Sequence, residues 1–196
     1  MIQAPLRQQI IDAAIDLTSA TGWSSVTMSG LADVVGVSRQ TVYNEVGSKP
    51  ALAEAMVLDE LARFLALVET AFDEHPADPV NAVRAAVAAV LNRADGSGLL
   101  RAIVSASYGQ DSALLPLLTT QASALLSTAS EVVQNRLRPC TEDLDERHLA
   151  VTVDVIVRTV LGHVMQPTMA ARECADGLAW ITGLALTNAA ATPGRT

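Results

Sequence analysis

Apolar residues recur at helical spacing along most of the chain, and the pattern is clearest in residues 27–49, TMSGLADVVGVSRQTVYNEVGSK. Met28, Leu31 and Val35 lie three and then four residues apart, which places them on one face of a helix. Gly36 follows with no Cβ, as a tight turn requires, and a second short helix comes after it. The pattern predicts a helix-turn-helix.

The second of these helices carries polar side chains on its outer surface. Ser38 is suited to be its N-cap, and the residues that follow supply hydrogen-bond donors and acceptors: Arg39, Gln40, Thr41, Tyr43 and Asn44. In helix-turn-helix proteins the first residues of the second helix contact base edges in the major groove. Arg and Gln read bases with paired hydrogen bonds, whereas hydroxyl groups mostly contact phosphates. The alternative interpretation is a small helical hairpin with a polar outer face.

A longer run of motifs surrounds this segment. An amphipathic helix and a Gly22–Trp23 break precede T-M-x-x-L-A-x-x-x-G-V-S, then T-V-Y, then a lysine that opens the next helix. Over residues 6–56 this order resembles the DNA-binding domain of TetR-type transcriptional repressors. The chain departs from the family pattern at Glu45–Val46, where members often carry an aromatic residue or a His-Phe pair.

The polar helix and the resemblance together define the candidate DNA-binding residues. They lie at the start of the second helix, on the third and at the start of the fourth: Thr27, Ser38, Arg39, Gln40, Thr41, Tyr43, Asn44 and Lys49. Ser48 and Pro50 mark the start of the fourth helix. The Lys49 ammonium and that helix N-terminus could therefore share one phosphate, although a solvated lysine is the plain alternative.

The remaining apolar spacing predicts further helices and an all-α fold. We expect a long helix from Ala51 to about Glu74, a loop at residues 95–98, and other helices at 80–93, 99–107, 114–137, 145–166 and 169–189. The resemblance implies about nine helices in two domains. These are an N-terminal three-helix DNA-binding domain at 1–48 and a helical ligand-binding and dimerisation domain at 49–190. We expect residues 191–196 to be a disordered tail.

Charge and composition limit how the protein could bind DNA. Half of the residues are hydrophobic, and the net charge is −8. Residues 1–50 carry three basic side chains, Arg7, Arg39 and Lys49, against four acidic ones, so they are not the basic patch of a strong DNA binder. DNA affinity would depend on a few placed contacts, on helix N-termini and on a homodimer, with a modest salt dependence.

We expect the helices after residue 50 to enclose a small-molecule pocket. The resemblance implies a small apolar or amphipathic effector, and the candidate lining residues are Phe64, Leu65, Val68, Ile103, Val104, Tyr108, Leu118, Leu125, Val157, Leu161 and His163. Such pockets are mostly apolar with a few orienting polar groups. The same residues would equally describe a solid core, and His163 could be a satisfied core histidine.

The last two helices carry more apolar residues than one core face needs, so two of their faces should be buried. The resemblance implies that this pair forms a four-helix homodimer interface, with candidates Val153, Val160, Val164, Trp180, Ile181 and Leu184. Such a dimer would place its two reading helices in successive major grooves of a double-stranded, pseudo-palindromic operator.

The sequence contains no recognisable metal-binding or catalytic motif. The three histidines have no partners at metal-ligand spacing, no nucleophile motif occurs, and we expect no catalytic residues, no metal and no cofactor. No signal peptide and no membrane span is expected, which favours a cytoplasmic protein. The competing hypotheses are a helical ligand-binding or scaffold protein whose helix-turn-helix does not bind DNA, and an all-helical enzyme.

Overall fold

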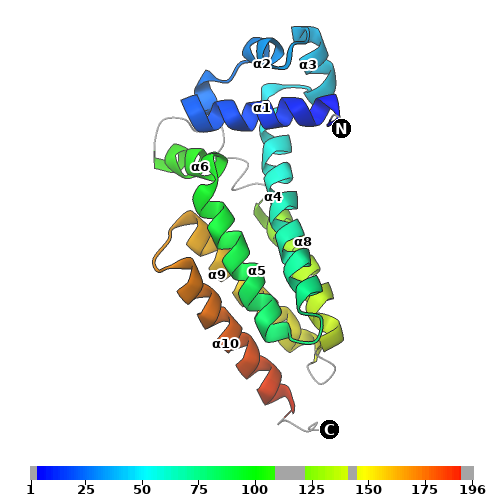
Figure 1. Cartoon of the computed structure of the whole chain (residues 1–196), viewed down its shortest axis with the longest axis vertical. Coiled ribbons are helices and arrows are strands. Elements are labelled where there is room, and N and C mark those ends of the chain that lie inside the picture. The colour runs from blue at the N-terminus through cyan, green and yellow to red at the C-terminus, as the bar shows by residue number, and fades with distance from the viewer. Residues whose placement is uncertain (1–3, 109–121, 141–144, 191–196) are drawn as a thin grey trace. The chain divides into compact units, whose positions relative to one another are not determined.

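Helices make up nearly all of the structure. The computed structural model describes residues 4–108, 122–140 and 145–190, and within these ranges it contains nine α-helices, two short 3₁₀ helices and no strand. Figure 1 shows this arrangement, which confirms the predicted all-α class. The chain divides into two compact units, Met1–Ala62 with Ser97–Ala122 and Arg63–Gly96 with Ser123–Thr196.

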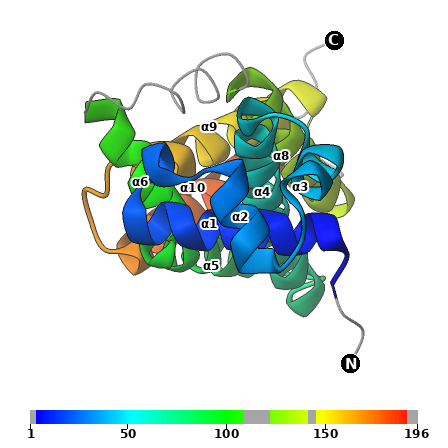
Figure 2. The same ribbon diagram turned by 90° about the horizontal axis from the view of Figure 1, so that it is seen from above.

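The first unit is organised around α1. Its elements are α1 (Leu6–Thr21), η1 (Trp23–Ser25), α2 (Met28–Val35), α3 (Arg39–Val46), the first part of α4 (Lys49–Glu74) and α6 (Gly98–Tyr108). Helix α1 contacts α2, α3 and α6, and Figure 2 shows it crossing beside α2. The largest side chains that are fully buried in this core are Ile10, Ile11, Val26, Leu31, Val42, Leu52, Met56 and Leu99.

Two glycines of the first unit have identifiable structural roles. Gly22 ends α1 at a positive φ of 84°, at the predicted Gly22–Trp23 break. Gly98 begins α6 where the helix meets α1, and a Cβ at this position would collide with the Ser19 side chain. Gly98 therefore allows the close packing of α6 on α1.

The second unit packs four helices with the end of α4. They are α5 (Pro79–Gly96), α8 (Ala122–Leu137), α9 (Glu146–Met165) and α10 (Ala171–Ala190), with η2 (Arg138–Cys140) after α8. Helix α10 runs along α5, and α9 contacts both (Figure 1). Helices α5 and α10 are in direct contact: a Cβ on Gly183 would lie 3.7 Å from a methyl group of Val80, an ordinary van der Waals distance.

The helix boundaries agree with the sequence except at residues 95–98. We predicted a loop there, but α5 continues through Gly96 and α6 begins at Gly98, so only Ser97 separates the two helices. Ser97 contacts the first turn of α6, because the Leu100 amide donates a hydrogen bond to Ser97 Oγ over 3.3 Å. Part of the helix predicted at 114–137, and the tail at 191–196, lie outside the described residues.

Candidate nucleic-acid interface

The helix-turn-helix is held by two side-chain caps and one left-handed glycine. Thr27 caps α2 by accepting a hydrogen bond from the Gly30 amide over 3.0 Å, and Ser38 caps α3 by accepting from the Thr41 amide over 3.1 Å. Between them Gly36 ends α2 at φ 78°, a conformation that side chains with a Cβ rarely adopt. The predicted Ser38 cap and the predicted turn are confirmed.

One face of α3 is fixed in the core of the first unit. Val42 is fully buried and Val46 nearly so, and both pack in the same cluster as Leu31 and Ala32 of α2. Burial of these apolar side chains sets the rotation of the helix about its axis. The opposite face, with Arg39, Gln40, Tyr43 and Asn44, is therefore exposed to solvent.

The exposed side chains of α3 form two pairs, each four residues apart. The Arg39 guanidinium lies 5.4 Å from the centre of the Tyr43 ring and donates to the Tyr43 hydroxyl over 3.3 Å. Gln40 Nε2 donates to Asn44 Oδ1 over 3.0 Å. These contacts orient the donors of a guanidinium and of an amide along the helix. Arginine and glutamine are side chains that read guanine and adenine edges.

Ser38 and Thr41 contact each other at the start of α3. Their hydroxyl oxygens lie 2.8 Å apart, and the Thr41 side chain is half-buried. The Ser38 oxygen also caps the helix, so its main role in this structure is to shape the turn. Thr27 has the same role at the start of α2, where its side chain is exposed.

Lys49 joins the start of α4 to the segment after α1. Its ammonium lies 4.8 Å from the centre of the Trp23 ring and donates to the Ser24 carbonyl over 3.3 Å. Trp23 is buried in the core of the first unit. The contact adds a second role that the sequence did not indicate, because Trp23 also supports the only lysine of the chain.

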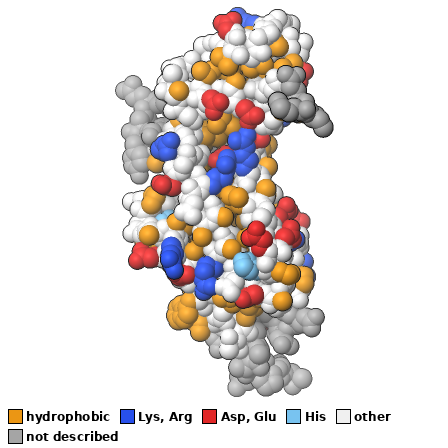
Figure 3. Space-filling view, viewed as in Figure 1, with side chains coloured by type: hydrophobic (Ala, Val, Ile, Leu, Met, Phe, Trp, Pro, Cys, Tyr) orange, Lys and Arg blue, Asp and Glu red, His pale blue; other side chains and the backbone are white. Residues whose placement is uncertain are grey.

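Charges of both signs are mixed over the visible surface. Figure 3 shows acidic and basic side chains interspersed on this face, without one continuous basic area. On α3 itself Arg39 and Glu45 are both exposed. The arrangement therefore presents a small number of placed cations and amides, which suits recognition of specific positions better than non-specific attraction to phosphates.

The candidate ligand-binding residues are divided between the two units. Phe64, Val68 and Val157 belong to the core of the second unit, whereas Ile103 is buried in the core of the first. Val104, Leu65 and Leu125 are half-buried and His163 is buried. The Tyr108 side chain and Leu118 lie outside the described residues. Ile103 therefore belongs to the core cluster of the first unit, and its role in a pocket stays a prediction.

Leu161 also departs from its expected place. Its side chain is 41 % exposed, on the outside of α9. Because α9 continues without a break from Glu146 to Met165, a residue two positions from buried His163 lies on a different side of the helix. Leu161 therefore does not face the core in which an enclosed pocket would have to lie.

The candidate interface residues of α9 and α10 separate into exposed and buried groups. Trp180 is 67 % exposed, and Ile181 and Leu184 are exposed beside it on α10. Val153 is only 1 % exposed and packs in the core, and Val160 and Val164 pack against the same core. Val153 is therefore corrected to a core residue, since its side chain is covered within one chain.

The structure adds two exposed apolar residues that the sequence did not single out on α9. Val151 and Val155 lie four residues apart on its outer face. By length and composition alone, helix α9 is apolar enough to cross a membrane, and only 22 % of its most apolar 18-residue window is buried within the chain. We define the apolar face as Val151, Val155, Trp180, Ile181 and Leu184.

Two family models match the chain. The model of the bacterial tetracycline repressor C-terminal domain matches residues 78–183, and that of bacterial regulatory proteins of the tetR family matches residues 10–56. Among the described residues, no group of three His, Cys, Asp or Glu side chains is placed to hold a metal ion.

Individual relatives match the chain over different lengths. The HTH-type transcriptional regulator AlkX of Mycobacterium tuberculosis is 29 % identical over 181 residues, which cover 90 % of this chain and 83 % of that protein. The crystal structure of the TetR family repressor AlkX from Dietzia sp. strain DQ12-45-1b, implicated in biodegradation of n-alkanes, superposes with a TM-score of 0.74 at 28 % identity, covering 92 % of this chain and 97 % of that one. The tetracycline repressor protein class D of Escherichia coli is 39 % identical over 57 residues, 29 % of this chain and 26 % of that protein.

Proposed function

Because the chain belongs to the TetR family of bacterial regulatory proteins, we propose that it is a cytoplasmic homodimeric repressor that binds a pseudo-palindromic operator through α3. A small apolar or amphipathic effector releases it from DNA. The observation that carries the proposal is the outer face of α3, where Arg39 and Gln40 are exposed and oriented by Tyr43 and Asn44.

The polar residues divide into base-reading and phosphate-binding groups. Arg39 and Gln40 occupy the first turn of α3, the part of a recognition helix that reaches base edges. Tyr43, Asn44 and the capped starts of α2 and α4 contact the backbone on either side. Lys49 supplies a phosphate-binding cation by exchanging its contact with the Ser24 carbonyl for a phosphate oxygen.

The apolar face provides the dimer contact. Its five side chains are exposed in a single chain, and two copies related by a two-fold axis would cover each other's faces. The two-fold axis explains why a pseudo-palindromic operator fits, since its half-sites repeat the protein symmetry. Burial in a dimer also accounts for the apolarity of α9 without a membrane.

The effector acts through a helix shared by both units. Residues Lys49–Ala62 of α4 belong to the first unit, and Arg63–Glu74 belong to the second. An effector that binds better to a dimer with altered spacing between its two α3 helices shifts the population away from the DNA-bound form. The implication of the Dietzia relative in n-alkane biodegradation supports an apolar effector.

A helical binding protein without DNA affinity is the second candidate, favoured by the net charge of −8 and by exposed Glu45 on α3. An electrophoretic shift assay at low salt distinguishes the two. We expect a specific, competitor-resistant complex with the promoter region beside the protein's own gene. Absence of a sequence-specific complex at low salt would reject the repressor in favour of the second candidate.

A further inference from the structure

A hollow of about 310 Å³ lies between α5 and α10 in the second unit. It shares no residue with the candidate DNA-binding, ligand-binding or dimer residues. Its lining combines three alanine side chains with five polar or charged ones: Ala85, Ala88, Ala175, His75, Asn81, Arg84, Arg172 and Asp176. The hollow therefore offers apolar surface and charge to the same small molecule.

The charge of this lining is opposite to that of the whole protein. Arg84 and Arg172 contribute two positive charges and Asp176 one negative charge, so these three lining side chains together are net positive. The chain as a whole carries a net charge of −8. Two guanidinium groups that share one lining carboxylate, beside an apolar surface, suit an organic monoanion.

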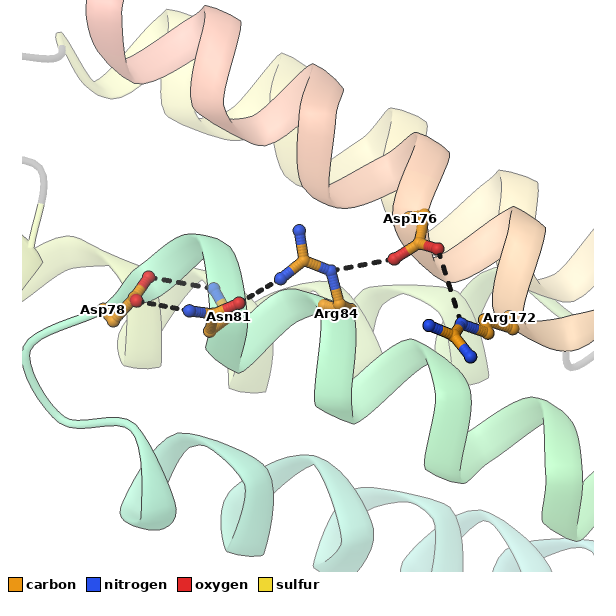
Figure 4. A network of polar contacts seen from close by, with 5 residues as sticks. All are labelled: Asp78, Asn81, Arg84, Arg172 and Asp176. Atoms are coloured by element: carbon orange, nitrogen blue, oxygen red, sulfur yellow. Dashed lines mark hydrogen bonds and ion pairs between the residues drawn. The ribbon is translucent and has the colours of Figure 1, made fainter.

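Arg84 is held in place by contacts on two sides. Asp78 Oδ1 accepts from the Asn81 amide over 3.0 Å, and Asp78 Oδ2 accepts from Asn81 Nδ2 over 2.5 Å. Asn81 Oδ1 in turn accepts from Arg84 Nη1, and Arg84 Nε pairs with Asp176 Oδ1 over 2.9 Å. Figure 4 shows this chain of contacts, in which the remaining guanidinium nitrogen of Arg84 has no partner among the residues drawn.

Arg172 is held far more weakly than Arg84. Its Nε lies 3.9 Å from Asp176 Oδ2, and its side chain is 93 % exposed. Figure 4 shows the Asp176 carboxylate between the two guanidinium groups. A second carboxylate could therefore pair with Arg172 and with the remaining Arg84 nitrogen at the loss of only one long ion pair.

We propose that this hollow binds a small organic carboxylate, whose charged group pairs with Arg84 and Arg172 and whose short hydrocarbon part covers Ala85, Ala88 and Ala175. Asp176 competes with the ligand for both guanidinium groups. The site is separate from DNA recognition. A bound carboxylate would tie α5 to α10, the helix that carries Trp180, Ile181 and Leu184.

Isothermal titration calorimetry of the full-length protein tests the site, with sodium hexanoate as the probe and hexanol as its uncharged counterpart. We expect saturable binding of one hexanoate per chain and no comparable binding of hexanol. Failure of hexanoate to saturate, or equal binding of hexanol, would overturn the proposal. The titration contains no DNA, so its result is independent of operator binding.

Charge variants separate ligand contacts from structural effects. Removal of a carboxylate contact weakens hexanoate binding about tenfold in Arg84→Gln and about threefold in the more exposed Arg172→Gln. Asp176→Asn removes the competing carboxylate and tightens binding about threefold. This tightening is decisive because a variant that merely loosens the fold would bind more weakly.

The matched control is Arg147→Gln, which removes one exposed positive charge from α9 outside the hollow. We expect its hexanoate affinity to equal that of the wild type. Weaker binding by Asp176→Asn would contradict the competition assigned to Asp176. The same loss in Arg147→Gln as in Arg172→Gln would show that only the overall charge matters. Either result would reject the site.

Discussion

On the outer face of α3, the side chains proposed to meet DNA are already ordered by their neighbours. Arg39 lies against the Tyr43 ring and Gln40 donates to Asn44, so each loses part of its rotamer freedom before binding. These intrahelical contacts are weak, about 0.5 kcal/mol each. A base edge can therefore replace them without a large penalty.

Lys49 gives the first test at the residue scale. Lys49→Gln removes one phosphate contact, so affinity for operator and for scrambled DNA should fall by the same factor, and the salt slope should decrease by about one. Fluorescence anisotropy over a range of salt concentrations measures both. Lys49→Arg keeps the charge and is the control. A loss confined to the operator would mean that Lys49 reads sequence instead.

Gly36 gives the second residue-scale test. At φ 78° a Cβ is strained, so Gly36→Ala should lower the free energy of unfolding by about 1 kcal/mol in urea denaturation. Gly96→Ala is the matched control, because Gly96 has no positive φ and a Cβ there would meet no other atom within 4 Å. Equal stability of both variants would contradict the role assigned to the turn.

At the scale of elements, capping residues made helix starts predictable. Thr27, Ser38 and Ser48 each accept a hydrogen bond from an amide of the first turn, as their positions before apolar periodic segments indicated. The end of α5 was not predictable in this way. Glycine normally marks a turn, but Gly96 remains within α5, and only Ser97 separates it from α6.

Which apolar residues face outward was also beyond the sequence. Val153 and Val155 are the same residue type two positions apart on α9, yet the first is buried and the second exposed. Only the packing of α9 on α5 and α10 decides between them. Likewise the Trp23–Lys49 contact joins residues far apart in sequence, and no local pattern indicated it.

Two capping aspartates, Asp145 at α9 and Asp78 at α5, should make the stability of the fold sensitive to acid. At α9 the backbone amide and then the ring of His148 hydrogen-bond to Asp145 and lower its pKa, and Asn81 lowers the pKa of Asp78 at α5 in the same way. A carboxylate whose folded pKa is lowered stabilises the fold above its ordinary pKa. That stabilisation is lost as the pH falls through the lowered pKa.

We therefore expect the melting temperature to fall as the pH drops below 3.8, the ordinary pKa of Asp, with a smaller fall in Asp145→Asn. Asparagine also caps helices, so this substitution removes the titrating charge and keeps the capping oxygen. Circular dichroism melts at several pH values measure the effect. Asp16→Asn, on the exposed part of α1, is the control. An unchanged pH dependence in Asp145→Asn would contradict the role of this cap.

At the scale of the whole molecule, the proposed function depends on pairing two copies through the apolar face. Trp180→Asp places a charge in the proposed interface, where it would be buried without a partner. We expect a monomer by analytical ultracentrifugation and loss of operator affinity with an intact helical fold. Val34→Asp, on exposed α2, is the control for adding one acidic group. A dimeric Trp180→Asp would exclude this face as the interface.

The most direct test of the account is the ratio of affinities for operator and scrambled DNA, measured for the wild type and for Arg39→Ala. We predict that Arg39→Ala lowers this ratio by a factor that corresponds to about 1–3 kcal/mol of binding free energy per half-site, because a base contact is lost. Affinity for scrambled DNA should change little. An unchanged ratio, or an equal loss on both DNAs, would contradict the claim that α3 reads the operator.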